Sequence, residues 1–239
     1  AEAIVDLGAI ASNIKHLMAI SGKPALAVVK ADAYGHGLVP VAKQALQAGA
    51  TWLGVALLEE AIALRENGVT APIIAWLTPI SDDFHSAVKN EIDIAIPSLE
   101  HLHAIIEAGV STGKTPRIHL EVDTGMSRGG ALLEWSELIQ AAASAESSGK
   151  LKIVGIWSHF ARADEPGHDF NREQRERFIA AVAEAKAVGV NPDVIHLSNS
   201  AATINDSDSH FDLVRLGISM YGLSPDVKSL GDSAALGLK

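Results

Sequence analysis

The most informative part of this sequence is Ala27-Val-Val-Lys-Ala-Asp-Ala-Tyr-Gly-His-Gly37. The apolar, β-branched run from Leu26 to Val29 predicts a buried strand that ends at Lys30. Burying a lysine amine at the end of such a strand costs free energy unless the amine is paired with another group or takes part in chemistry. Polar and aromatic side chains crowd into the glycine-punctuated turn that follows, namely Asp32, Tyr34 and His36. A lysine that merely extends past the strand end into solvent is the simple alternative, but these neighbours favour a ligand-binding site.

Short β-rich runs alternate with helical patterns along the whole chain. Strands are predicted at 26–30, 51–56, 72–76, 92–96, 117–122, 153–157, 194–197 and 213–216. Helices are predicted at 6–20, 38–48, 58–66, 82–90, 98–108, 132–148, 171–188 and 200–204, with Asp6 and Ser98 as N-caps. This alternation indicates parallel strands joined by right-handed crossovers. Eight such units suit a closed (β/α)8 TIM barrel, an α/β fold of about 250 residues, better than an open sheet.

We assign residues 1–223 to the barrel and residues 224–239 to a tail or linker. The sequence begins at Ala1 without a methionine, and it ends at Lys239 after this loose segment. Both ends lead us to expect a processed chain or a fragment of a longer protein.

The composition restricts the kinds of partner. The 19 basic and 29 acidic residues give a net charge of −10, which argues against nucleic acid or an anionic membrane surface. No apolar run approaches the roughly 20 residues of a membrane span, and no signal-peptide pattern opens the chain. The chain has no cysteine, which excludes disulfides and thiolate metal sites.

Polar residues gather at the predicted carboxyl ends of the strands, where barrels of this kind bind their ligands. The fifth strand leads from Glu121 to Arg128, and the sixth leads to His159. His159 and His196 end adjacent strands, so we expect them to share a hydrogen-bonded layer with Arg215 of the eighth strand. The spacing of the two histidines gives no metal-binding signature. The opposite strand ends carry mostly Gly, Lys and Pro linkers, so we expect all of the polar chemistry on one rim.

The sequence resembles alanine racemases, the pyridoxal 5'-phosphate (PLP) enzymes built on a (β/α)8 barrel. The matching motifs occur in the order that this family requires: AVVKADAYGHG, VDTGMSR, WSHF, LSNSAAT and VRLGISMYGLSP. The resemblance covers the chain from Asp6 to Pro225. It implies that Lys30 forms a Schiff base with PLP and also serves as one of two catalytic bases.

The resemblance assigns roles to further residues and implies no metal. The cofactor phosphate would be held by Tyr34, Ser200, Gly217 and Ile218. Arg215 would face the pyridine nitrogen and keep it unprotonated, which makes the ring a weaker electron sink and suits simple proton exchange. Arg128 would approach the phenolic oxygen and the substrate, and His159 would lie against the ring with Asn199 nearby.

Glu121 departs from the pattern of the family. Many alanine racemases have a carbamylated lysine at this position, and its negative charge orients the arginine that matches Arg128. A glutamate supplies a carboxylate without carbon dioxide, so we predict that Glu121 replaces that group and belongs to the catalytic set. A variable strand residue without a role is the alternative.

The family continues into a mainly β second domain that this sequence lacks. That domain brings a tyrosine to the face of the substrate Cα opposite the lysine, and neither Tyr34 nor Tyr221 occupies that context. We therefore expect interconversion of L- and D-alanine only by the complete protein, and weak or no activity of this chain. The resemblance further implies a cytoplasmic enzyme of D-alanine biosynthesis for cell-wall peptidoglycan. A homodimer is expected at full length, and a monomer for the barrel alone.

Three rival interpretations remain open from the sequence. A stand-alone barrel that carries PLP without turnover, like the PLP homeostasis proteins, would explain the short chain. A D-amino-acid aldolase on the same barrel would need a metal site, which His159 and His196 do not offer convincingly. A barrel that only binds a phosphate ligand would leave the amine of Lys30 without a purpose.

Overall fold

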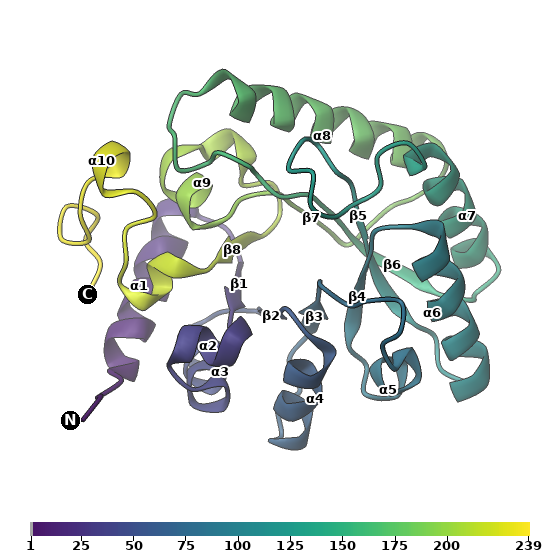
Figure 1. The fold of residues 1–239 in the computed structure, drawn as a ribbon, viewed down its shortest axis with the longest axis horizontal. Helices are drawn as coiled ribbons and strands as arrows, with labels where there is room; N and C mark the ends of the chain where they lie inside the picture. The colour runs from purple at the N-terminus through teal and green to yellow at the C-terminus, as the bar shows by residue number, and fades with distance from the viewer. Residues whose placement is uncertain (1) are drawn as a thin grey trace.

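Eight parallel strands form one sheet that curls into a barrel, in the order β7-β6-β5-β4-β3-β2-β1-β8. The computed structural model describes residues 2–239. The strands are β1 (Ala25–Val28), β2 (Trp52–Val55), β3 (Ile73–Ala75), β4 (Asp93–Ile96), β5 (Arg117–Glu121), β6 (Lys152–Trp157), β7 (Val194–His196) and β8 (Val214–Leu216). Figure 1 shows them in the middle of the molecule with helices around them. The predicted (β/α)8 fold is confirmed.

Helices cover the outside of the strands. They are α1 (Leu7–Ser21), α3 (Leu38–Gln47), α4 (Leu58–Glu66), α5 (Phe84–Lys89), α6 (Leu99–Thr112), α7 (Trp135–Ser147) and α8 (Asp169–Ala187). The remaining helical segments are α2 (Lys30–Gly35), α9 (Ser200–Asn205), α10 (Val227–Leu230) and the 3-10 turns η1 (Ser207–Ser209) and η2 (Ile218–Tyr221). Asp6 and Ser98 cap α1 and α6 as predicted, because each side chain accepts a backbone N–H of the first turn. Within residues 2–239 no helix has the length and hydropathy needed to span a membrane.

The barrel closes between β7 and β8 through single hydrogen bonds rather than a regular ladder. The N–H of Asp212 donates to the carbonyl of Ile195 at 3.0 Å, and the Asp212 carboxylate accepts the N–H of Ile195 at 2.9 Å. Further along, the N–H of Arg215 donates to the carbonyl of Ser198 at 3.0 Å. This closure brings Arg215 beside the carboxyl end of β7.

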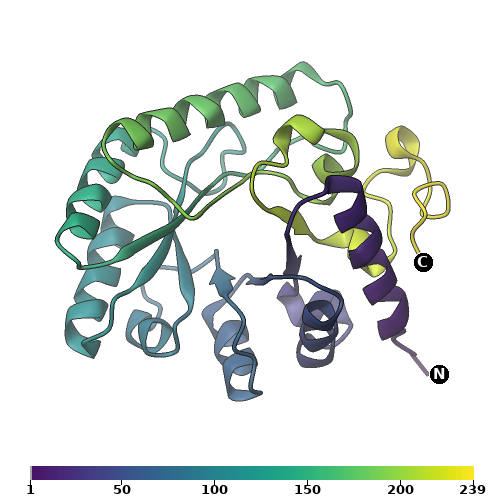
Figure 2. The same ribbon diagram turned by 180° about the vertical axis from the view of Figure 1, so that it is seen from behind.

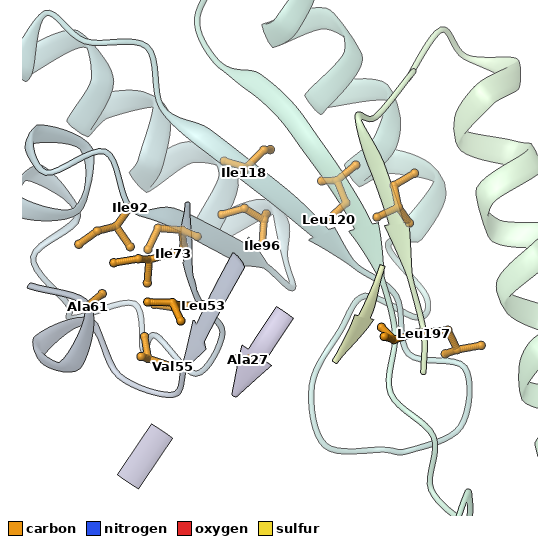
Figure 3. Packing of buried hydrophobic residues seen from close by; sticks show 14 of the residues in the cluster. Ala27, Leu53, Val55, Ala61, Ile73, Ile92, Ile96, Ile118, Leu120 and Leu197 are labelled. Carbon is orange, nitrogen blue, oxygen red and sulfur yellow. The ribbon is translucent and has the colours of Figure 1, made fainter. Parts of the chain in front are cut away.

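The main hydrophobic core lies between the strands and the surrounding helices. Side chains alternate along each strand, so Leu53 and Val55 of β2 point outward to this core. Figure 3 shows both residues gathered with Ile73 of β3 beside Ala61 of α4. This packing fixes the positions of the strands, and with them the rim on which the site is built.

The barrel interior is divided into an apolar and a polar part. Four buried apolar residues form a separate cluster, packed against Trp52 and Trp76: Leu26, Val28, Ile74 and Leu213. The polar part holds buried ionisable groups, namely Asp93, His119, His196 and Arg215. Gly155 makes room for one of them, because a Cβ at this position would lie 2.1 Å from Nδ1 of His119.

The last segment of the chain folds back onto α1. Figure 2 shows it beside α1, at the same end of the molecule as the N-terminus. Leu238 is buried, and the side chain of Asn13 bonds both the N–H and the carbonyl of Lys239, at 2.8 and 2.9 Å. The assignment of 224–239 as a tail or linker stays a prediction.

Replacing Gly155 by alanine should destabilise the barrel through His119. We expect Gly155→Ala to lower the free energy of unfolding by about 1–3 kcal/mol, the usual range for an overpacked core. Urea denaturation would measure this cost. In a His119→Ala background the obstacle is gone, so the same substitution should cost less. Equal costs in both backgrounds would contradict the packing described above.

Candidate functional site

A cavity of about 260 Å³ opens at the carboxyl ends of the strands. Most of the residues predicted from the sequence line it: Lys30, Tyr34, Arg128, His159, Asn199, Ser200, Arg215, Gly217 and Ile218. They come from loops that are far apart in the sequence and are brought together by the barrel. Glu121 is the exception, because it is buried next to the cavity and does not line it.

The strand β1 ends at Val28, two residues earlier than predicted. Lys30 therefore begins the turn that follows the strand. Its amine lies 6.0 Å from the centre of the Tyr34 ring. Burial lowers the pKa of Lys30, the nearby Arg128 guanidinium lowers it further, and Glu60 opposes both effects. A lowered pKa makes the amine a better nucleophile near neutral pH.

The residues after Lys30 form a left-handed helical turn instead of the expected glycine turn. Four consecutive non-glycine residues, Ala31 to Tyr34, have φ between 53° and 55°. Each such residue costs roughly 1–2 kcal/mol, so the turn persists only because its surroundings fix it. Ala33 is fully buried, and the Tyr34 ring lies 4.8 Å from the ring of Tyr221. The turn directs the Tyr34 hydroxyl toward the loop after β8.

The hydroxyls of Tyr34 and Ser200 and the backbone at Gly217 form a small cradle at one end of the cavity, which could hold an anion. The hydroxyl of Ser200 accepts the N–H of Gly217 at 2.9 Å and that of Ser219 at 3.3 Å. A Cβ on Gly217 would lie 3.0 Å from the Tyr34 hydroxyl and 3.7 Å from the Ser200 hydroxyl. Only glycine therefore leaves the space between these donors open. Asn199 sits at the edge, where its side chain caps α9 through the N–H of Ala202.

Arg215 is buried at the base of the cavity, where its terminal nitrogens Nη1 and Nη2 are engaged and its Nε–H has no hydrogen-bond partner within residues 2–239. It donates to the carbonyls of Ser158, His196 and Leu197 at 2.8 to 3.0 Å. It also donates to Nδ1 of His196 at 3.2 Å and to Nδ1 of His159 at 3.0 Å. The expected layer of two histidines and one arginine is present. Burial lowers the pKa of Arg215 to about 9, and Glu121 opposes this effect.

The hydrogen-bond partners assign the protons of the histidines, because arginine can only donate. Nδ1 of His196 accepts from Arg215, so its Nε2 carries the proton and donates to Nδ1 of His119 at 3.1 Å. His119 is then protonated at Nε2, which faces the Asp93 carboxylate at 3.4 Å. The same argument places the proton of His159 on Nε2. Burial and the Arg215 charge lower the pKa of His159 and of His196 well below the usual value, so both stay neutral.

Asp93, His119 and their partner Arg117 were not expected from the sequence. The Asp93 carboxylate accepts two hydrogen bonds from the Arg117 guanidinium, at 2.6 and 3.1 Å. Burial alone would raise the pKa of Asp93, but the bonds from His119 and Arg117 outweigh it and lower the pKa. Asp93 and Arg117 begin β4 and β5, so the expectation that polar chemistry is confined to the carboxyl rim was wrong. The sequence signal that could have revealed this pair was an acidic residue, Asp93, near the start of one predicted strand and a basic residue, Arg117, at the start of the next.

The loop from Glu121 to Arg128 is ordered by its own polar groups. The Asp123 carboxylate accepts the N–H groups of Gly125 and Ser127, at 2.8 and 3.1 Å. Glu121 lies behind this loop, where a Cβ on Gly129 would come within 3.1 Å of its carboxylate. Burial raises the pKa of Glu121 to about 7, although Arg128 and Arg215 both lower it. Glu121 is therefore a titrating group near neutral pH rather than the permanent carboxylate expected from the sequence.

A family model described as "Alanine racemase, N-terminal domain" matches residues 5–225. Among curated relatives, the alanine racemase of Salinispora tropica is 47% identical over 226 residues, which cover 94% of this chain and 61% of that protein. The alanine racemase of Mycobacterium tuberculosis strain H37Rv is 45% identical over 234 residues, with 97% and 61% covered. The chain thus spans about three fifths of the length of the curated relatives it matches.

Solved structures agree with these relatives. The alanine racemase from D-cycloserine-producing Streptomyces lavendulae is 43% identical and superposes with a TM-score of 0.96, over 98% of this chain and 62% of that one. The alanine racemase from Bacillus anthracis with bound L-Ala-P is 39% identical, with a TM-score of 0.84 over 94% and 58%.

The proton assignment makes a direct spectroscopic prediction. In ¹⁵N spectra of the cofactor-free protein at neutral pH, His119, His159 and His196 should each carry the proton on Nε2 alone. A through-bond coupling should connect Nε2 of His196 to Nδ1 of His119, because a hydrogen bond joins them. A proton on Nδ1 of His196 would contradict the assignment, since Arg215 has no acceptor to offer.

The raised pKa of Glu121 predicts a pH-dependent contribution to stability. In the unfolded chain Glu121 titrates near its ordinary pKa, so between about pH 4.5 and 7 the folded state binds the extra proton. The parent should therefore gain stability relative to Glu121→Gln as the pH falls from 8 to 5. Urea midpoints of both proteins across this range would measure the difference. A difference that stays constant with pH would show that Glu121 titrates normally.

Proposed function

Because the chain belongs to the family of alanine racemase N-terminal domains, we propose that it binds pyridoxal 5'-phosphate through Lys30 and supplies one of the two bases that interconvert L- and D-alanine. One observation carries this proposal. A nucleophilic lysine, an anion cradle and a buried arginine line the same cavity.

The residues of the cavity fit this cofactor. The space that a Cβ on Gly217 would fill lies between the hydroxyls of Tyr34 and Ser200, and it suits a phosphate oxygen. Ile218 also lines the cavity, directly after Gly217. Lys30 and the cradle thus provide one attachment for an aldehyde and another for a phosphate, and PLP carries both groups.

When bound, the pyridine ring of PLP withdraws electrons and makes the Cα–H of an amino acid more acidic. Lys30 would move a proton at that carbon, because its lowered pKa lets the free amine act as a base. Arg215 would donate to the ring nitrogen and leave it unprotonated, since a guanidinium has no proton acceptor. An unprotonated ring withdraws electrons less strongly and favours proton exchange over reactions that need a long-lived carbanion.

Arg128 and His159 would orient the bound molecules. Arg128 lines the cavity near Lys30 and is suited to pair with a substrate carboxylate. Nδ1 of His159 is engaged by Arg215, so its Nε2–H is the donor left for the cofactor or the substrate. In its ionised form, Glu121 would steady the loop that carries Arg128 from behind, in place of the carbamylated lysine that the family often has.

The second base is proposed to lie outside this chain. Neither of the two tyrosines in the sequence suits the role of the second base. The hydroxyl of Tyr221 donates to the carbonyl of Val28 at 2.9 Å, and the hydroxyl of Tyr34 belongs to the cradle. Lys30 serves one face of Cα only, so this chain should exchange the α-proton slowly and racemise alanine poorly or not at all. The complete protein would act in the cytoplasm as a homodimer and supply D-alanine for peptidoglycan.

Cofactor binding should depend on Lys30. We expect the chain mixed with PLP to develop a visible absorption band that borohydride traps on Lys30, and Lys30→Ala to show neither band nor adduct. Alanine in deuterated water should then lose its α-proton slowly in the parent. A trapped adduct without any exchange would instead favour a PLP carrier without turnover. No adduct in the parent would count against the proposed cofactor.

Replacing Glu121 should weaken substrate binding without removing the cofactor. The variant Glu121→Gln removes the charge that faces Arg128, so the alanine concentration needed for half-maximal exchange should rise several-fold. Glu134→Gln, which changes a glutamate further along the same segment, is the matched control. Unchanged affinity for both PLP and alanine in Glu121→Gln would show that Glu121 has no role in the site.

A further inference from the structure

We propose that Glu60 is a positioning residue for Lys30: its carboxylate holds the first peptide of the left-handed turn and thereby fixes where the lysine side chain enters the cavity. This inference deepens the proposed function, because it concerns the lysine that would bind the cofactor. The role of Glu60 is indirect, since it does not line the cavity itself.

The Glu60 carboxylate connects two segments that are distant in sequence. One oxygen accepts the N–H of Ala31 at 2.5 Å, directly after Lys30. The other accepts the N–H groups of Ala56 and Leu57 at 2.9 and 3.1 Å, in the turn between β2 and α4. Lys30 is thus tied, through the residue that follows it, to the neighbouring strand of the barrel.

This arrangement requires a carboxylate. Three N–H donors approach the two oxygens of Glu60 from two different segments, so both oxygens must accept. A glutamine offers one accepting oxygen, and its amide NH₂ would face at least one of the backbone N–H groups. Glutamine at position 60 must therefore give up either the contact with Ala31 or the contacts with Ala56 and Leu57.

The strained turn explains why such a contact is needed. Ala31 is the first of the four left-handed residues, and other contacts support the turn further along. Asp32, the second of them, is bonded to the residues that follow the turn: its carboxylate accepts the N–H of Leu38 at 2.6 Å, and its carbonyl accepts the N–H of Gly37 at 2.9 Å. Glu60 secures the beginning of the turn from outside the segment, at the point where the backbone leaves Lys30.

Glu60 also contributes charge to the surroundings of the Lys30 amine. The groups that face this amine are Arg128, His159, the Tyr34 ring and Glu60. Arg128 disfavours the ammonium form, whereas Glu60 favours it. Removal of the Glu60 charge should therefore move the titration of Lys30 to lower pH.

The test compares Glu60→Gln with Glu59→Gln, a matched substitution of the exposed glutamate next to it. The first measurement is hydrogen exchange of the Ala31 amide in the cofactor-free protein. We expect exchange in Glu60→Gln to be faster by roughly tenfold to a hundredfold, the effect of losing a hydrogen bond to a charged acceptor. Glu59→Gln should match the parent.

The second measurement is the pH profile for the rate at which PLP forms a borohydride-trappable adduct on Lys30. In Glu60→Gln the profile should shift to lower pH and its plateau should fall, because both the charge and the contact are lost. Glu60→Asp keeps the charge on a shorter side chain, so its profile should stay near that of the parent while its Ala31 amide exchanges faster. A residue needed only for stability would lower the unfolding midpoint and leave this profile unmoved.

Unchanged protection of Ala31 in Glu60→Gln would overturn the proposal, and so would an unshifted profile with the parental plateau. If Glu60→Gln fails to fold, the Glu60→Asp protein gives the decision through its Ala31 exchange. If the parent forms no adduct, the proposed cofactor is wrong, whereas exchange of Ala31 still decides whether Glu60 holds the turn.

Discussion

The buried guanidinium of Arg215 sets the constraint on which the rest of the site depends. A guanidinium has five N–H groups and no acceptor, so a barrel that buries one must surround it with acceptors. Three carbonyls and two imidazole nitrogens accept from Nη1 and Nη2, which leaves the Nε–H for a ligand, and the Trp157 ring lies 5.2 Å from the guanidinium carbon.

The consequences of this constraint extend through the barrel. Because Arg215 only donates, it fixes the proton of His196, which fixes the proton of His119, and the series ends at the acceptor-only carboxylate of Asp93. Gly155 belongs to the same arrangement, since any larger residue would occupy the space of His119. The interior of the barrel therefore serves two purposes: it packs the strands, and it orients one cation at the base of the cavity.

The sequence was a good guide wherever the chemistry lies at strand ends. Alternating strand and helix patterns predicted the barrel, and nine of the ten site residues named from the sequence line the cavity. Lys30 and Gly217 follow β1 and β8 within two residues, and Ser200 begins the helix after β7, so all three were expected at the strand ends that bind ligands in such barrels. The left-handed turn was not predictable, because nothing in alanine, aspartate or tyrosine announces a positive φ. It results from contacts such as those of Glu60, which are set by the tertiary structure.

The hydrogen bond that links Asp93 and His119 inside the barrel was not predicted either, because it too is set by the tertiary structure. Asp93 and His119 lie on different strands, and no local pattern links an acid at the start of one strand to a histidine within the next. Glu121 shows a further limit, because its place beside the cavity follows from the end of β5, while its protonation depends on burial that only the structure reveals.

The central claim is that Arg215 donates to the cofactor ring, and ¹⁵N spectroscopy of the chain reconstituted with PLP labelled at the pyridine nitrogen tests it most directly. We expect the chemical shift of an unprotonated nitrogen that accepts a hydrogen bond, with no change between pH 6 and 8. A protonated pyridine nitrogen would contradict this claim, because Arg215 could not then face it as a donor.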